Sequence, residues 1–174
     1  MGESVELDAV EFITAGAVGE PGQRVFYVQA DAPDRRVTLL AEKTQVRSLA
    51  QLAQELLARA GVTVTPDDLD EAAQRLREPV EPLWRAGSMS LGMDDEGERF
   101  LLEVEQLPDT LEEGEEPGEA RFWMNREQLV ALAAYAAFAV EAGARESCQL
   151  CGRPIDPNEG HVCPATNGHG PLTE

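Results

Sequence analysis

The sequence predicts an α+β fold in which two similar strand-strand-strand-helix units form antiparallel sheets with packed helices, followed by a small C-terminal zinc knuckle. Two observations predict the units: strand-like apolar segments come in two groups of three, and apolar residues at helical spacing follow each group. A third predicts the knuckle, because all three cysteines lie in the last 27 residues. We therefore expect a main domain over residues 1–146, with repeat halves at about 5–61 and 84–143, and a zinc-binding tail over 147–174.

The first half is expected to hold three strands and a helix. Segments rich in alternating or β-branched apolar residues, separated by glycine, proline and aspartate, predict strands at residues 6–15, 24–30 and 37–41. Apolar residues then recur at helical spacing from Val46, and Gly61 ends the run. A second, short helix is expected to start at Thr65, which can cap it, with Pro66 at the first helical position.

The second half repeats this plan. Three further segments have the composition of strands and predict them at residues 84–93, 99–106 and 120–124. A helix is expected to follow, with Asn125 as its cap and Gln128 reaching back to the cap backbone. Gly143 is expected to end this helix.

Short sequence matches between the halves predict a duplicated unit. Residues 22–26 resemble residues 97–101, and residues 42–46 resemble residues 125–129. A three-stranded sheet with one helix buries little apolar surface, so two copies gain stability by sharing their apolar faces. Chance similarity between two amphipathic units is the alternative.

The charge of the chain restricts its partners. It carries 33 acidic against 14 basic residues, a formal net charge of −19. Such a field repels nucleic-acid phosphates and anionic membrane surfaces, so we expect no nucleic-acid binding. No apolar run is long enough to cross a membrane, and the N-terminus lacks the hydrophobic run of a secretory signal. A cytoplasmic protein that binds a protein partner is the prediction, and the sequence leaves its oligomeric state open.

The tail carries the clearest chemical motif. Cys148 and Cys151 have the Cys-x2-Cys spacing of a zinc knuckle, and His161 and Cys163 lie two residues apart, so both side chains can face one ion. These four residues predict a tetrahedral Zn²⁺ site, with His169 as the rival fourth ligand. Four protein ligands leave no position for water, which favours a structural ion over a catalytic one. The alternative is a set of free thiols without metal.

Other candidate sites have weaker signals. Arg24 and Arg99 occupy equivalent places at the starts of predicted strands and could form a paired anion site, although pairing with nearby carboxylates is the simpler interpretation. The acidic loop 108–119 could dock a basic partner or a hard cation, or could simply be solvated. The main domain has no histidine, which excludes a histidine-based catalytic dyad there, and no Gly-rich phosphate loop is present.

The motifs together resemble a family of uncharacterised, mainly actinobacterial proteins catalogued as domain of unknown function 3090. The resemblance rests on residues 12–24 and 42–46 and, most specifically, on the tail from Cys148 to Gly168. It implies a cytoplasmic protein without established activity, accompanied by a phosphatidylinositol-kinase-like protein and a histidine-phosphatase-like protein. It also supports His161 as a ligand. One departure is Gln149, where the family often has proline.

Two functions are expected from these features. The first is a non-catalytic binding or adaptor protein with a structural zinc site, which the resemblance makes a partner of the kinase-like and phosphatase-like proteins. The alternative is an enzyme or binder that acts on a phosphorylated small molecule between the two halves, with Arg24 and Arg99 at its site. The absence of a recognisable catalytic set favours the first.

Overall fold

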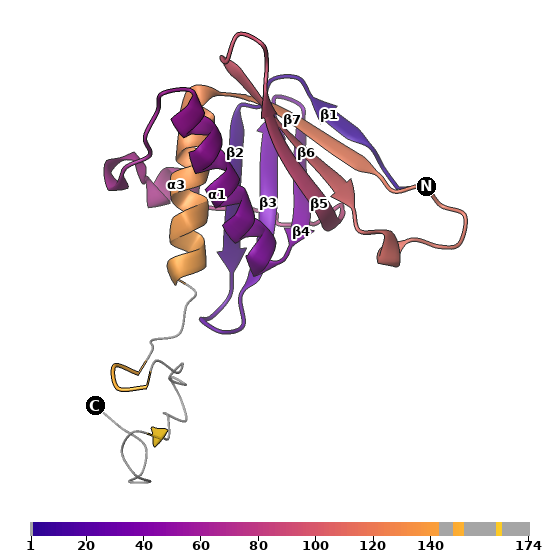
Figure 1. Cartoon of the computed structure of the whole chain (residues 1–174). Helices are drawn as coiled ribbons and strands as arrows, with labels where there is room; N and C mark the ends of the chain where they lie inside the picture. Colours follow the sequence, from indigo (N-terminus) through magenta and orange to yellow (C-terminus); the bar gives the residue numbers. More distant parts are fainter. Residues whose placement is uncertain (1, 143–147, 152–162, 165–174) are drawn as a thin grey trace.

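A computed structural model describes residues 2–142, 148–151 and 163–164. Figure 1 shows a sheet with two long helices side by side on one of its faces. The predicted α+β class is confirmed at this level. Among the described residues, none of the helices is long and apolar enough to cross a membrane.

One seven-stranded sheet organises the main domain, in the order β1-β7-β6-β5-β4-β3-β2. Neighbouring strands are antiparallel except at two places, where β1 runs parallel to β7 and β4 runs parallel to β5. The strands are β1 (Val5–Leu7), β2 (Phe12–Val18), β3 (Val25–Ala32), β4 (Arg35–Ala41), β5 (Trp84–Met93), β6 (Arg99–Gln106) and β7 (Glu119–Asn125).

The first predicted strand, residues 6–15, is in fact two strands at opposite edges of the sheet. β1 pairs with β7, whereas β2 pairs with β3. Between them, the backbone N–H of Val10 donates to the carbonyl of Trp123 at 3.0 Å, and that of Glu11 donates to the carbonyl of Asp31 at 2.8 Å. The sheet therefore curls until its two edges are bridged by residues 8–11, a long-range contact that local periodicity does not report.

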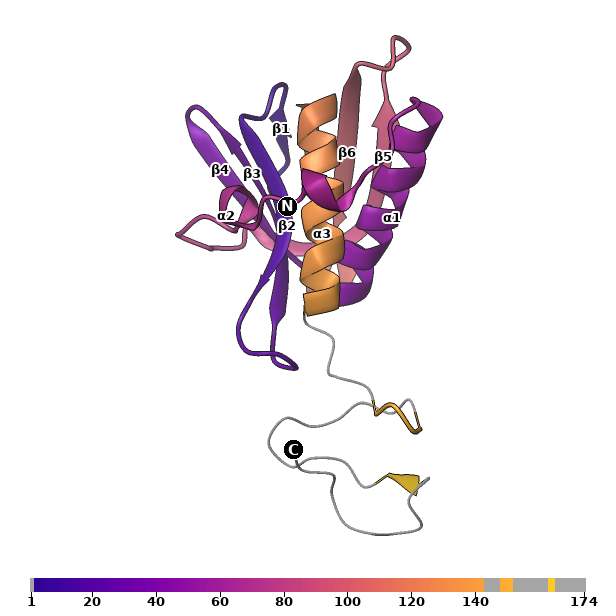
Figure 2. The same ribbon diagram turned by 90° about the vertical axis from the view of Figure 1, so that its left-hand side faces the viewer.

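The two long helices, α1 (Lys43–Arg59) and α3 (Arg126–Ala142), have 17 residues each. They pack against each other and lie side by side in both views (Figures 1 and 2). The predicted helix at Thr65 is split, since the backbone is extended at Leu69 between a 3₁₀ turn, η1 (Pro66–Asp68), and a short helix, α2 (Glu71–Gln74). A second 3₁₀ turn, η2 (Pro108–Thr110), begins the acidic loop.

Buried positions recur between the long helices at one constant spacing. Each buried residue of α1 has a buried counterpart 83 positions later in α3. The pairs are Val46 and Leu129, Leu49 and Leu132, Ala50 and Ala133, Ala53 and Ala136, and Leu57 and Val140. These residues pack into the main core with the inward side chains of the sheet.

The starts of both helices are held in the same manner. Gln45 Oε1 accepts the N–H of Glu42 at 2.7 Å, and Gln128 Oε1 accepts the N–H of Asn125 at 2.9 Å. The amide of each glutamine also reaches the opposite half. Gln45 Nε2 donates to the carbonyl of Ala86 at 3.0 Å, and Gln128 Nε2 donates to the carbonyl of Val10 at 2.7 Å. Each helix start is thereby fixed near the first strand of the other half. The two helix starts resemble each other, but the duplication of the whole unit stays a prediction.

A polar row fixes the long connection between the halves. Thr14, Gln29 and Thr38 lie opposite one another across β2, β3 and β4, and all three are buried. Gln29 Oε1 accepts the backbone N–H of Arg77 at 2.7 Å, and Thr14 Oγ1 donates to the carbonyl of Gln74 at 2.6 Å. Because buried polar groups need partners, this row positions residues 74–78 on the sheet.

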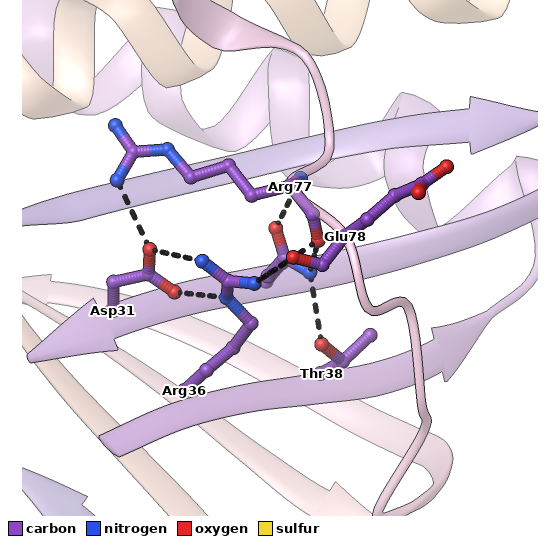
Figure 3. Close-up of polar contacts among 6 residues, drawn as sticks. Asp31, Arg36, Thr38, Arg77 and Glu78 are labelled. Carbon is purple, nitrogen blue, oxygen red and sulfur yellow. Dashed lines mark hydrogen bonds and ion pairs between the residues drawn. The ribbon is translucent and has the colours of Figure 1, made fainter. Parts of the chain in front are cut away.

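An ion cluster secures the same connection (Figure 3). Asp31 accepts two hydrogen bonds from Arg36, at 2.7 and 3.0 Å, and one from Arg77 at 3.0 Å. Arg36 Nη1 also donates to the carbonyl of Glu78 at 2.6 Å. The crossover between the halves is therefore tied to the hairpin of β3 and β4 by side chains as well as by backbone.

Candidate metal centre

The three cysteines come together although eleven residues separate the second from the third. Cys148 begins a turn that runs through Cys151, and Cys163 returns to the same place. The three Sγ atoms all lie within 4.8 Å of one another, and Cys148 and Cys163 are buried. His161 and its rival His169 lie outside the described residues, so the choice of fourth ligand stays a prediction.

The sulfur spacing fits a shared metal ion. The Sγ atoms of Cys148 and Cys163 are 3.7 Å apart. Two sulfurs bonded tetrahedrally to Zn²⁺ at about 2.3 Å would be separated by about 3.8 Å. A disulfide needs an S–S distance of about 2.05 Å, so the sulfurs of Cys148 and Cys163 are too far apart to be bonded to each other. The geometry therefore suits three ligands of one tetrahedral ion better than it suits a disulfide.

The local backbone favours the thiolate form that binds metals. The pKa of Cys148 is lowered from 9.0 to about 6, chiefly because the backbone N–H groups of Leu150 and Cys151 donate to its sulfur. The thiols of Cys163 and Cys151 lower the pKa further, and burial opposes them. The turn of the Cys-x2-Cys motif therefore favours metal binding, since a thiolate rather than a thiol coordinates a metal.

Among the described residues, these cysteines are the one group of His, Cys, Asp and Glu side chains close enough together to hold an ion. The acidic loop 108–119 thus shows no cation site within the described part of the chain. The side chains of Gln106 and Ser4 accept backbone N–H groups at its end, from Gly118 and Glu119 at 3.0 Å each.

The two arginines of the predicted anion site lie in different surroundings. Arg24 lines a pocket beside the start of α1, together with Lys43 and Arg85. Arg99 does not line that pocket; its Nη2 donates to the carbonyl of Asp8 at 2.6 Å, and its guanidinium lies 4.6 Å from the centre of the Trp123 ring. Two strands, β4 and β5, separate β3 from β6 in the sheet. Lys43 and Arg85 are the cationic neighbours that sequence reasoning missed.

Arg24 and Arg99 also do not correspond to each other in the two halves. Phe26 pairs with Ala41 in the first hairpin, and Phe100 pairs with Met124 in the second. Both phenylalanines are buried, so they occupy matching positions. When the two hairpins are aligned on these phenylalanines, Arg99 falls opposite Val25, one residue away from Arg24. A shift of one residue places side chains on opposite faces of a strand.

A family described as "Protein of unknown function (DUF3090)" matches residues 5–163. Neither the curated proteins nor the solved structures give a match to the chain. The match covers most of the main domain and extends through Cys163. The chain belongs to this family.

Proposed function

We propose that this member of the DUF3090 family is a non-catalytic binding or adaptor protein whose tail is folded by a structural zinc ion. The convergence of Cys148, Cys151 and Cys163 carries the proposal, and His161 completes the ligand set. When bound, the zinc supplies folding energy, because a short segment with few apolar residues has no core of its own.

The ligand chemistry supports a structural role. Three thiolates and one imidazole fill a tetrahedron, so no coordination position remains for a reacting water. The backbone N–H groups that lower the pKa of Cys148 do so before any metal arrives, which prepares the sulfur for coordination. Cys148 and Cys163 are buried, and Cys151 is partly buried.

Zinc content and single-ligand variants test the site. Elemental analysis of the full chain purified with zinc should give one equivalent, and Cys151→Ser should lose most of it. His161→Ala is paired with His169→Ala as a matched control, and only the former should lower the zinc affinity. Zinc content below about half an equivalent in the parent chain, or unchanged content in Cys151→Ser, would overturn the site. Loss in His169→Ala alone would assign the fourth ligand to His169.

The binding role rests on composition and on the family resemblance. Both histidines fall in the tail, so the main domain has no imidazole for acid–base work. The phosphatidylinositol-kinase-like and histidine-phosphatase-like proteins suggested by the resemblance are the proposed partners. A reducing compartment, the cytoplasm, suits a thiolate centre.

Binding to each proposed partner can be measured separately. The zinc-loaded chain is immobilised and each purified partner is titrated over it, with Cys151→Ser as the variant that lacks a folded tail. Saturable binding that weakens in the variant supports an adaptor role of the tail. Absence of binding to both proteins, at concentrations up to about 100 μM, would remove them as partners.

We also propose that the protein binds no nucleic acid. The tail carries Arg153 as its one arginine, and the net charge of −19 opposes phosphate backbones. Fluorescence anisotropy with single-stranded, duplex and hairpin probes should show no saturation. Salt-sensitive binding tighter than about 1 μM would contradict the proposal.

Finally, we propose that the two halves are copies of one unit. Support comes from the constant spacing of 83 residues between buried positions of α1 and α3, and from the matching roles of Gln45 and Gln128. The same spacing relates buried positions of β4 to those of β7, with Val37, Leu39 and Ala41 matching Ala120, Phe122 and Met124.

A further inference from the structure

A pocket of about 390 Å³ lies where the two halves meet. Its walls come from the start of β3, the end of β4, the first residues of α1 and Arg85 of β5. Residues distant in sequence meet here because β4 and β5 pair in parallel, with Leu40 opposite Arg85. The volume falls in the range of about 300–1,000 Å³ that small-molecule sites occupy.

The pocket collects positive charge on a strongly acidic protein. Three of the 14 cationic residues of the chain line it: Arg24, Arg85 and Lys43, which is the single lysine in the sequence. Glu42 is the one acidic residue in the lining, and it forms an ion pair with Arg85. The lining is therefore net positive, whereas the chain as a whole carries −19.

One donor in this lining has no acceptor. Arg24 Nε is buried and has no hydrogen-bond partner among the described residues. A buried N–H group without a partner is costly, and native structures rarely keep one without a reason. Because this atom is itself covered, an anionic oxygen in the pocket would provide the missing acceptor only after a shift of the Arg24 side chain.

The start of α1 adds to the positive field. The helix has 17 residues and begins at Lys43, in the pocket wall. Its first turn presents backbone N–H groups and the positive end of the helix dipole, an arrangement that suits phosphate. The N–H of Glu42 is already used by Gln45, and the Glu42 side chain accepts the backbone N–H of Gln45, so the donors that remain in the first turn are those of Lys43 and Thr44.

At the matching positions of the second half, a tryptophan and two arginines contact one another or the backbone. Trp123 stands 83 residues after Leu40, and the guanidinium of Arg99 stacks over its ring. Arg126, the counterpart of Lys43, donates through Nη2 to the carbonyl of Gly97 at 3.3 Å. Arg99 and Arg126 are thus engaged within the protein, whereas Leu40 lies in the lining of the pocket.

We propose that this pocket binds the phosphomonoester group of a small molecule. The side chains of Arg24, Lys43 and Arg85 balance the two negative charges of the phosphate, and the guanidinium of Arg24 donates to its oxygens. The apolar walls formed by Phe26 and Leu40 contact the organic part of the ligand. Glu42 sets a limit on affinity, because its carboxylate competes with the phosphate for Arg85.

Calorimetric titration of the full zinc-loaded chain tests the proposal. The probes are inorganic phosphate and glycerol phosphate, with glycerol and potassium chloride as controls at matched ionic strength. We expect one saturable site for both phosphates, tighter for glycerol phosphate, and none for glycerol or chloride. Saturation by chloride at the same strength, or no saturation below about 10 mM phosphate, would overturn the proposal.

Variants locate the site. Arg24→Gln and Lys43→Ala should each weaken glycerol phosphate binding by about tenfold or more, since each removes a charge-assisted contact. Arg126→Ala, at the matching start of α3, should change it by less than about twofold. Glu42→Gln should strengthen binding by freeing Arg85. Equal affinities for Arg24→Gln, Lys43→Ala and Arg126→Ala would overturn the assignment.

Two further measurements separate this proposal from others. Zinc content should be unchanged in Lys43→Ala, so failure at the pocket is distinguishable from failure at the cysteines. Should Arg24→Gln fail to fold, Lys43→Ala carries the test alone, because that side chain lies at the surface of the pocket. A phosphoserine peptide that binds tighter than glycerol phosphate would reject a small-molecule ligand in favour of a phosphoprotein.

Discussion

Replacing Asp31 by asparagine should weaken the attachment of the crossover between the two halves. Asp31 is 7% exposed and accepts three hydrogen bonds from the guanidinium groups of Arg36 and Arg77. A hydrogen bond to a charged group contributes about 1.5–3 kcal/mol when it is well shielded. Here the arginine side chains are 30% and 49% exposed, so solvent screening reduces that value.

We expect Asp31→Asn to lower the free energy of unfolding by about 2 kcal/mol at pH 7. Asparagine keeps one acceptor oxygen, and Arg36 keeps the carbonyl of Glu78, so neither cation is left wholly unpaired. Urea denaturation of the full chain, followed by tryptophan fluorescence, gives the difference. Asp34→Asn, an exposed aspartate in the turn of the same hairpin, is the matched control and should stay within about 0.5 kcal/mol of the parent.

The effect of Asp31→Asn should depend on pH in one direction. Burial alone would raise the pKa of Asp31, but the hydrogen bonds and charges of Arg36 and Arg77 outweigh it and hold the pKa below 3.8. A lowered pKa in the folded state contributes stability that is present above the unfolded value and is lost as pH falls through the folded one. The difference between parent and variant should therefore be constant near neutrality and shrink below about pH 4.

Two results would refute this reasoning. One is an Asp31→Asn cost no larger than that of Asp34→Asn. The other is a difference that grows on acidification, since it would require the pKa of Asp31 to be raised by folding.

Three other perturbations have defined outcomes. Gln45→Ala and Gln128→Ala should each reduce the free energy of unfolding by about 1–2 kcal/mol in urea, because each glutamine joins a helix start to the other half; an unchanged midpoint would deny this role. Gly16→Ala should cost about 1–3 kcal/mol because its Cβ would lie 2.9 Å from Cε1 of Tyr135, whereas Gly92→Ala, with open space, should be near neutral. Removal of zinc by a chelator should make all three cysteines reactive to a thiol reagent and leave the urea midpoint of the main domain unchanged; a lowered midpoint would show that the tail supports the core.

Local patterns predicted the helices well because their determinants are local. The apolar spacing from Val46 predicted α1, and the predicted cap at Asn125 is confirmed by reciprocal hydrogen bonds with Gln128, both 2.9 Å long. Caps and periodicity involve residues three or four apart, so one sequence suffices to find them.

Features that depend on curling of the sheet were not predictable in this way. The predicted strand at residues 6–15 divides because Val10 reaches Trp123 at one edge and Glu11 reaches Asp31 near the other. The pocket cations Lys43 and Arg85 meet through a parallel pairing of β4 with β5. Both contacts join residues that are far apart in the sequence, so the spacing of nearby residues does not reveal them. The Cys-x2-Cys motif, in contrast, is visible from the spacing of two nearby cysteines.

Comparison of the halves indicates where a duplicated fold would have acquired a specific function. Matching frameworks give the same core, since the same buried positions recur in both helices. The two halves can then differ in sequence at positions outside the core. One such position holds Leu40 in the first half and Trp123 in the second, and both side chains are partly buried. In the second half, the guanidinium of Arg99 stacks on the large ring of Trp123. In the first half, the smaller Leu40 lines the open pocket that holds three cations. Leu40→Trp should accordingly block glycerol phosphate while leaving zinc content intact, and undiminished phosphate binding in that variant would show that the pocket is not the site.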